Sequence, residues 1–280
     1  MEAFLDLLLS GTELEPWSFA LLCGVSFLDS FTTAALGLGG GGLVFATMAL
    51  FLTPTVLIPV HGVVQLGSNM GRAALMFRHM FYQILPPFLI GTILGAAIGG
   101  QLVFALPISL LQLILALFIL YITWAPKFTA SNPGKKTFFG LGAVGAFVTM
   151  FVGATGPLVA PFAAAACEER QQVVATHAML MTFQHGLKLI TFGILGFAFG
   201  PYIPLLVGLL AFGFAGTFAG KQMLDKLPKK IFRTILKIIL TLISLRLLYG
   251  AASAALSRPQ TKKAEPWPRL FLRLVKIERE

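Results

Sequence analysis

The chain has 280 residues, of which 57% are hydrophobic and only 11% are charged, and its formal net charge is +10. Since about a quarter of the residues in a soluble domain are charged, this composition excludes a soluble single-core enzyme, a disordered chain and a disulfide scaffold. Asp, Glu, Lys and Arg are missing from four long segments: 30–71, 79–126, 137–167 and 189–220. Each segment is long enough for at least one membrane-crossing helix of about 20 residues. The sequence therefore predicts an all-α, polytopic membrane protein.

The excess of positive charge does not indicate nucleic-acid binding. Lys and Arg lie in short connectors and in a C-terminal tail, which is where the cytoplasmic loops of membrane proteins concentrate them. The two cysteines, Cys23 and Cys167, have no CxxC spacing and are expected to pack as small apolar residues. We therefore expect no nucleic-acid partner, no metal site and no cofactor.

In chain order, an N-terminal extension (1–16) precedes a glycine-interrupted apolar stretch, Trp17–Leu52, which is broken at Gly39–Gly42. A helix with embedded polar residues is expected next, at Thr55–Met76. Two plainer helices follow, at 81–105 and 108–124. These four segments form a first transmembrane repeat, residues 17–124.

A linker, 125–136, leads to a second set of segments with the same character. These are a glycine-broken stretch, a polar-studded helix and two plainer helices, expected at 137–166, 171–197, 201–220 and 231–256. They form a second repeat, 137–256. The remaining residues, 257–280, alternate basic and apolar side chains, which suits an amphipathic helix on the membrane surface or, equally, a solvated basic end.

An internal duplication supports this division. Gly95–Pro107 (GAAIGGQLVFALP) and Gly216–Pro228 (GTFAGKQMLDKLP) agree at two glycines, one glutamine, one leucine and one proline with identical spacing. Sequence similarity at a fixed distance along the chain is typical of repeated structural units. We interpret residues 17–124 and 137–256 as two copies of one unit.

Equivalent corners of the two halves differ in charge, which predicts inverted repeats. Phe77-Arg78-His79 in the first half corresponds to the uncharged Ala198-Phe199-Gly200 in the second. The positive-inside rule puts such corners on opposite sides of the membrane. Inversion requires an odd number of crossings in each half, so each glycine-broken segment is expected to be a re-entrant or bent hairpin followed by three transmembrane helices. The linker 125–136 is then cytoplasmic, although the seven basic residues of the tail oppose the outside position that this topology gives them.

The glycine breaks predict a site for a small anion. Helices that begin after Gly42 and at Pro157 would each direct a positive dipole end toward the membrane centre, where two such ends favour an anion. The alternative is close packing of glycines between helices. From the breaks, the predicted site takes Gly39, Gly40, Gly41, Gly42, Gly153, Thr155 and Gly156.

The polar-studded helices contribute the other candidate residues. Polar and ionisable side chains lie on one stripe of each helix: His61, Gln65 and Arg72 in the first half, and His177, Gln184 and Lys188 in the second. Ionisable residues in a membrane span usually face a cavity or a partner, so all except Arg72 are assigned to substrate binding. Arg72 lies near a charged corner, and snorkelling to the interface explains it equally well. Proton coupling is assigned to His177, His61 and Asp29, although a structural hydrogen-bonding role remains open for each.

The motifs LGLGGGGLVFATMAL (36–50), MFVGATGPLVAPFAA (150–164) and GKQMLDKLPKKIFRTILKIILTLISLRLLY (220–249) together resemble the TauE/SafE family of sulfite and organosulfonate exporters. The resemblance covers about residues 17–250. It implies a multi-pass permease that moves sulfite, sulfoacetate or a related sulfur anion. The family usually has a proline shortly after the first glycine run, whereas Ala46 and Thr47 stand there in this chain; Pro161 matches the pattern in the second half.

The sequence therefore predicts a secondary transporter, not an enzyme, that exports a small sulfur-containing anion across the bacterial inner membrane by using an ion gradient. Its expected partners are the anion and the lipid bilayer. A passive anion channel is the main alternative. An intramembrane enzyme is a weaker one, because the chain lacks the GxSxG, HExxH and paired-carboxylate patterns.

Overall fold

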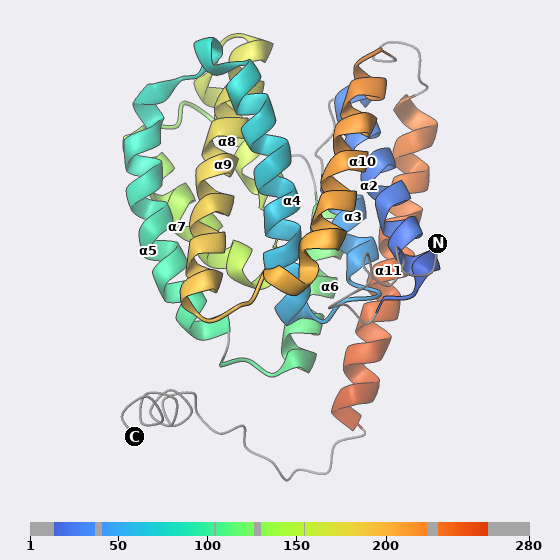
Figure 1. Cartoon of the computed structure of the whole chain (residues 1–280). Coiled ribbons are helices and arrows are strands. Elements are labelled where there is room, and N and C mark those ends of the chain that lie inside the picture. The colour runs from blue at the N-terminus through green and yellow to red at the C-terminus, as the bar shows by residue number, and fades with distance from the viewer. Residues whose placement is uncertain are drawn as a thin grey trace.

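A computed structural model describes residues 14–36, 41–103, 105–125, 130–153, 155–222 and 229–256, and within them it has ten α-helices and no strand (Figure 1). The helices of the first half are α2 (Pro16–Leu36), α3 (Gly42–Met48), α4 (Pro54–Leu75), α5 (Leu85–Val103) and α6 (Ile108–Trp124). Those of the second half are α7 (Lys135–Val152), α8 (Gly156–Ala166), α9 (Arg170–Ile194), α10 (Ile203–Gln222) and α11 (Lys229–Leu256). Short 3₁₀ turns occur at Phe77–His79, Tyr82–Ile84 and Gly200–Tyr202.

The expected helical segments agree with these helices to within a few residues at most ends. The expected C-terminal tail, most of the N-terminal extension, and residues 126–129 of the linker lie outside the described residues. Gly39 and Gly40 of the predicted anion site do so as well.

Both glycine-containing segments are broken into a long helix and a short one. Gly41 precedes α3 with φ 93°, and Gly153 ends α7 with φ 73°. Glycine adopts this left-handed conformation at little cost, whereas a side chain opposes it. In the first half the chain after α3 returns to the start of α2. Trp17 at the start of α2 packs edge-to-face against Phe51, with ring centroids 5.5 Å apart.

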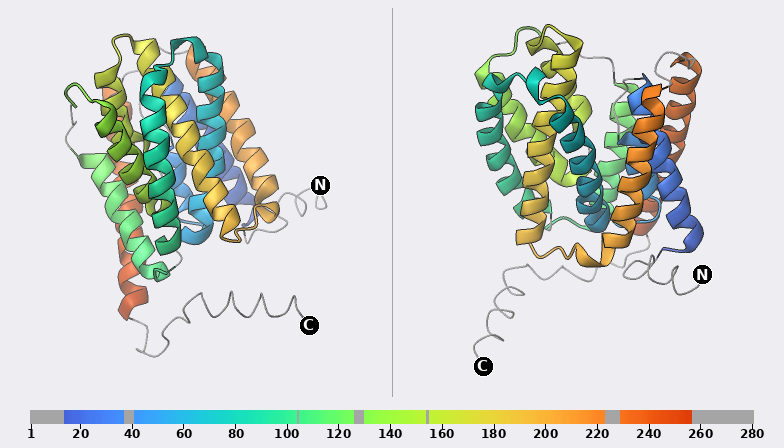
Figure 2. Two further views of the ribbon diagram at one scale, coloured as in Figure 1. Left: turned by 90° about the vertical axis from the view of Figure 1, so that its left-hand side faces the viewer. Right: turned by 45° about the horizontal axis from the view of Figure 1, so that its top comes forward.

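Every main helix pairing joins one half of the chain to the other. α5 lies along α7, and α10 lies along α2, while α4 crosses α9 and α6 contacts α11 (Figures 1 and 2). These pairings are reciprocal: the fourth helix of each half packs against the first helix of the other half. The two repeats are therefore interleaved, and neither buries its helices by itself.

The repeated glycines make equivalent contacts in the two halves. A Cβ atom at Gly95 of α5 would overlap the carbonyl of Ala143 in α7, and one at Gly216 of α10 would overlap the carbonyl of Phe27 in α2. Small residues allow helix backbones to approach this closely, which is how helices commonly associate in membranes. The matched glycines of the sequence repeat thus hold matched helix pairs together.

The outer surface is apolar, as expected of a protein in lipid. Three helices of the described part are long and apolar enough to cross a membrane: Tyr82–Val103, Lys135–Val152 and Gly200–Gly220. α4 and α9 are longer than needed, since 22 and 25 residues at 1.5 Å each extend about 33 and 38 Å. Large apolar side chains such as Ile98, Phe218 and Leu242 are more than half exposed. The chain is an integral membrane protein.

Substitution of either contact glycine is expected to separate its helix pair. Gly95→Ala and Gly216→Ala should each lower the unfolding free energy by about 1–3 kcal/mol, because overpacking forces the backbones apart. Thermal unfolding in detergent measures this change. Gly140→Ala and Gly24→Ala are matched controls, since a Cβ at either position meets nothing within 4 Å. Equal unfolding temperatures in all four variants would contradict the role assigned to these contacts.

Candidate functional site

A cavity of about 670 Å³ lies between α2, α4, α8, α9 and α10. It reaches the end of the bundle where α4 ends and α9 begins, since Leu75, Met76 and Gln171 line it. Most of its wall is apolar, and its polar lining comes from four helices. These polar residues are Ser26, Asp29, Ser30 and Thr33 on α2, Gln65, Ser68, Asn69 and Arg72 on α4, Gln171, His177 and His185 on α9, and Thr217 on α10.

Four polar side chains of α4 form a row of close polar contacts, which we call the α4 ladder; Nε2 of His61 makes only one of its two contacts as a hydrogen bond at a time. Arg72 donates through a terminal guanidinium nitrogen to Oδ1 of Asn69 at 3.0 Å, and Asn69 donates to Oε1 of Gln65 at 3.4 Å. The amide nitrogen of Gln65 lies 3.2 Å from Nε2 of His61, which in turn lies 3.1 Å from the carbonyl oxygen of Gly41. The ladder connects the half-buried Arg72 in the cavity to the first glycine break.

The first glycine break is closed by a carboxylate of the protein itself. Asp29 of α2 accepts hydrogen bonds from the backbone N–H groups of Gly41 at 2.6 Å and Leu43 at 3.2 Å. A negative group is favourable at the first turn of a helix, so this carboxylate stabilises the start of α3. Asp29 was predicted as a proton carrier, and in the structure its side chain is only 8% exposed and lies on the cavity wall.

The second glycine break lacks such a carboxylate among the described residues. Gly156 begins α8, and its carbonyl oxygen lies 3.1 Å from Nε2 of His177, which donates to it. Gly156, Pro157 and His177 all line the cavity. Gln184 donates to the carbonyl of Gly145 at 3.2 Å and to the hydroxyl of Thr155. The break is therefore fixed by side chains of α9.

Lys188 lies outside the cavity and is fully buried, with an exposed fraction of 0%. Its ammonium donates to the carbonyl oxygen of Gly153 at 3.1 Å. A Cβ atom at Gly62 would lie 2.7 Å from Cε of Lys188. The lysine therefore fits against α4 because residue 62 is a glycine. A buried ammonium is costly unless it is paired, and one carbonyl provides only partial compensation.

The structure thus divides the predicted site residues into two groups. Gly41, Gln65, Gly156, His177 and Asp29 line the cavity. The other described candidates do not line it: Gly42, His61, Gly153, Thr155, Gln184 and Lys188. His61, Thr155, Gln184 and Lys188 of this second group are at most 1% exposed.

Several polar cavity residues were not among the predicted binding residues, and three of them, Arg72, Asn69 and His185, lie on α4 and α9. Arg72 was interpreted equally well as a snorkelling residue, but its guanidinium is held by Asn69 and by the backbone carbonyl of Ser68 at 3.3 Å. Asn69 belongs to the same helical stripe as Arg72, so its position was detectable from spacing. His185 is only 2% exposed and its Nδ1 has no hydrogen-bond partner.

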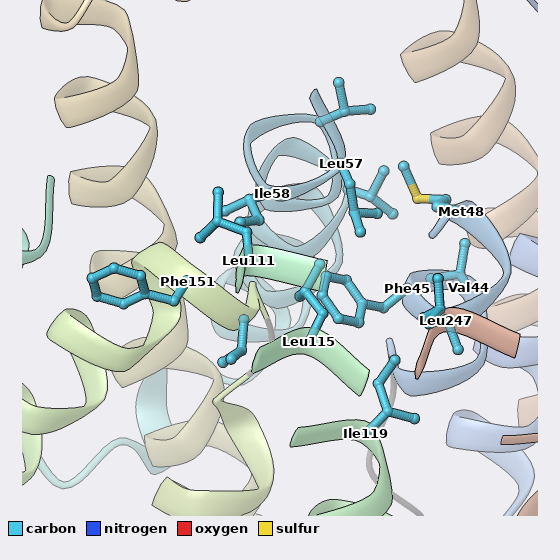
Figure 3. Close-up of a cluster of buried hydrophobic side chains, with 14 of the residues drawn as sticks. Val44, Phe45, Met48, Leu57, Ile58, Leu111, Leu115, Ile119, Phe151 and Leu247 are labelled. Carbon is cyan, nitrogen blue, oxygen red and sulfur yellow. The ribbon is translucent and has the colours of Figure 1, made fainter. Parts of the chain in front are cut away.

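The opposite end of the bundle is sealed by apolar side chains. Val44, Phe45 and Met48 of α3 pack with residues of α4, α6, α7 and α11 (Figure 3). Phe45, Leu57, Ile58 and Leu111 are all 0% exposed. The cavity extends to Leu75 and Met76 at the end of α4, whereas Leu57 and Ile58 of this cluster lie near its start, so the cluster packs toward the other end of the bundle; Val44 belongs to both.

Comparisons with curated proteins and with solved structures find no match. The sequence profile of the family described as Sulfite exporter TauE/SafE matches residues 22–247. This range contains both glycine breaks, the α4 ladder, Lys188 and most of both repeats, and it spans well over half of the chain. The chain therefore belongs to the TauE/SafE family of sulfite exporters, which are membrane transporters.

Proposed function

We propose that the protein is a secondary transporter that exports a small sulfur-containing anion, such as sulfite, sulfoacetate or a related organosulfonate, across the bacterial inner membrane. The observation that carries this proposal is a membrane-embedded cavity containing Arg72, the one Arg or Lys among the described residues that line it. Membership of the sulfite exporter family supports the same substrate class. The anion would enter through the open end and bind beside Arg72.

The donors of the cavity suit an oxyanion. A guanidinium presents several N–H groups in a fixed plane and binds oxyanions through two of them at once. Asn69 holds Arg72 in position, while Ser68, His177 and His185 provide further polar atoms around the same space. The largely apolar wall raises the strength of each interaction by excluding water. This combination fits a compact anion with an organic substituent.

The arrangement of helices supports inverted repeats. In Figure 1, α4 ascends from the lower end of the bundle, whereas its sequence equivalent α9 descends. Likewise, α2 runs opposite to its equivalent α7, and α5 runs opposite to its equivalent α10. Such halves are typical of secondary transporters, which bind substrate at the interface of their repeats.

A carrier explains the structure better than the alternative of a passive anion channel. A channel requires a continuous polar path, whereas the apolar cluster around Phe45 closes the bundle opposite the cavity. One-sided access is what a carrier shows in one of its two states. The anion would cross only when the protein exchanges those states.

Asp29 and His177 remain the proposed proton carriers. Protonation of Asp29 would remove the negative charge that faces the anion inside the cavity, so that the proton and the anion favour each other's binding. His177 lies across the same cavity and would gain a positive charge on protonation. Both effects would link movement of the anion to movement of a proton in the same direction.

Arg72→Gln should reduce kcat/KM for sulfite at least tenfold, because loss of a buried charge partner costs about 2–5 kcal/mol. Flux of labelled sulfite into proteoliposomes measures this. Arg72→Lys should retain intermediate activity, since it keeps the charge and loses the planar donors. Arg78→Gln is the control, because Arg78 is exposed and lies against Phe77 outside the cavity lining. Wild-type flux in Arg72→Gln would contradict the assignment.

Asp29→Asn should separate anion movement from proton movement. The variant should exchange labelled for unlabelled sulfite at a rate comparable to wild type, but an imposed pH gradient should no longer drive accumulation. A pH-sensitive dye inside the vesicles measures the accompanying proton flux. Glu15→Gln is the matched control, since Glu15 is exposed and bonds only Trp17 through its side chain in the described part of the chain. Accumulation that still follows the pH gradient would show that Asp29 carries no coupled proton.

A further inference from the structure

We propose that the protein has a second anion-binding site, built around Lys188, which is closed in this structure and opens to the membrane face opposite the cavity. Arg72 then receives the anion from one face, and Lys188 receives it from the other. This inference rests on the proposed function, because it assigns the two cations to two states of one transporter.

Arg72 and Lys188 occupy equivalent positions in the two halves. Each lies eleven residues after a histidine, His61 or His177. Both histidines lie 3.1 Å through Nε2 from a carbonyl oxygen at the glycine break of their own half. The two helices therefore have the same relation to their breaks, although one cation faces the cavity and the other is sealed.

The surroundings of Lys188 are incompletely satisfied. Gly145, Thr149 and Gly153 follow one another at intervals of four along one face of α7, and the outer two bind Gln184 and Lys188 of α9. Thr149, between them, has a buried hydroxyl without a partner. Buried polar groups are nearly always hydrogen-bonded, so the interval between the two helices has one unused hydroxyl donor.

Further unpartnered atoms lie around the same lysine. They are Nδ1 of His61 and Nδ1 of His185, which donate to an anion only when that nitrogen is protonated; Oε1 of Gln184 is also unpartnered, but an amide oxygen only accepts. His185 precedes Lys188 by three residues on α9, and His61 adjoins Gly62, whose position Cε of Lys188 approaches. Within the described residues, no carboxylate lies within ion-pair distance of its ammonium. An anion would supply the missing negative charge and accept from both Lys188 and Thr149.

Phe45 closes this region toward the opposite face. Its ring centroid lies 4.8 Å from that of His61, and its edge occupies the space where a Cβ at Gly153 would project. In Figure 3 the Phe45 ring points into the apolar cluster, toward Leu115 and Leu57. Displacement of α3 would remove this ring and expose the region around Lys188.

The two halves differ in the packing that such a displacement requires. α3 rests mainly against α2, to which Asp29 binds it, whereas α8 rests mainly against α9. If the halves exchange these arrangements, α3 moves toward α4 and α8 moves toward α7. Lys188 then becomes accessible and Arg72 becomes enclosed, which gives one available cation in each state.

Sided transport measurements test this proposal. The protein is reconstituted in a single orientation, and the sulfite concentration for half-maximal flux is measured separately from each face for wild type, Arg72→Gln and Lys188→Gln. Arg72→Gln should raise this concentration at least tenfold from the cavity face, with less than a twofold change from the opposite face. Lys188→Gln should show the reverse pattern, and Lys188→Arg should largely restore the wild-type value.

Equal effects of Lys188→Gln from both faces, or no effect from either, would overturn the second site while leaving sulfite transport intact. Absence of sulfite flux in wild type would instead overturn the proposed function itself. If Lys188→Gln does not give a monodisperse protein, Gly62→Ala decides the question. It retains every charge but displaces Cε of Lys188, and only the opposite face should respond. An unchanged Gly62→Ala, or one altered from both faces, would reject the proposal.

Discussion

Backbone that leaves the helical conformation inside a membrane must find hydrogen-bonding partners within the protein, because lipid offers none. Two such departures, at Gly41 and at Gly153–Gly156, organise the rest of this structure. Their N–H and carbonyl groups bind Asp29, His61, His177 and Lys188. The polar residues that a membrane helix ordinarily avoids are thus concentrated on α4 and α9, the two helices that cross beside the breaks. Two of these groups, Asp29 and His177, also lie on the wall of the cavity, whereas His61 and Lys188 are buried behind it.

Different kinds of side chain bind the backbone of the two breaks. A carboxylate holds the first, and only neutral or basic side chains hold the second in the described part of the chain. This difference gives the cavity a negative group on α2 opposite a positive group on α4. A duplicated chain with identical halves would have no such polarity. The unequal packing of α3 and α8 therefore accompanies an unequal distribution of charge around the cavity.

The extent of the helices was predictable, because hydropathy and glycine spacing are local in the sequence. Alignment of the two matched motifs pairs Gly95 with Gly216, and in the structure the two glycines make equivalent contacts. The distribution of site residues was not predictable in the same way. Whether Arg72 or Lys188 faces water depends on how α4 and α9 rotate against α3 and α8, which no single helix determines. Asp29 likewise binds the backbone of Gly41, twelve residues further along the chain, a contact that the spacing of residues does not predict.

The reciprocal glycine contacts also constrain how the protein is made. α5 can pair with α7 as soon as the second half begins, but α2 finds its close partner α10 only near the end of synthesis. Until these partners are made, the newly inserted first half presents to lipid the groove around Gly95 and the polar side chains of α2 and α4. Membrane insertion of the early helices must therefore precede their stable packing. A chaperone that binds these surfaces would protect the unfinished chain from degradation. The packing of α2 depends on α10, which is made late. A truncation after α9 would therefore leave α2 without its close partner even though α2 itself is intact.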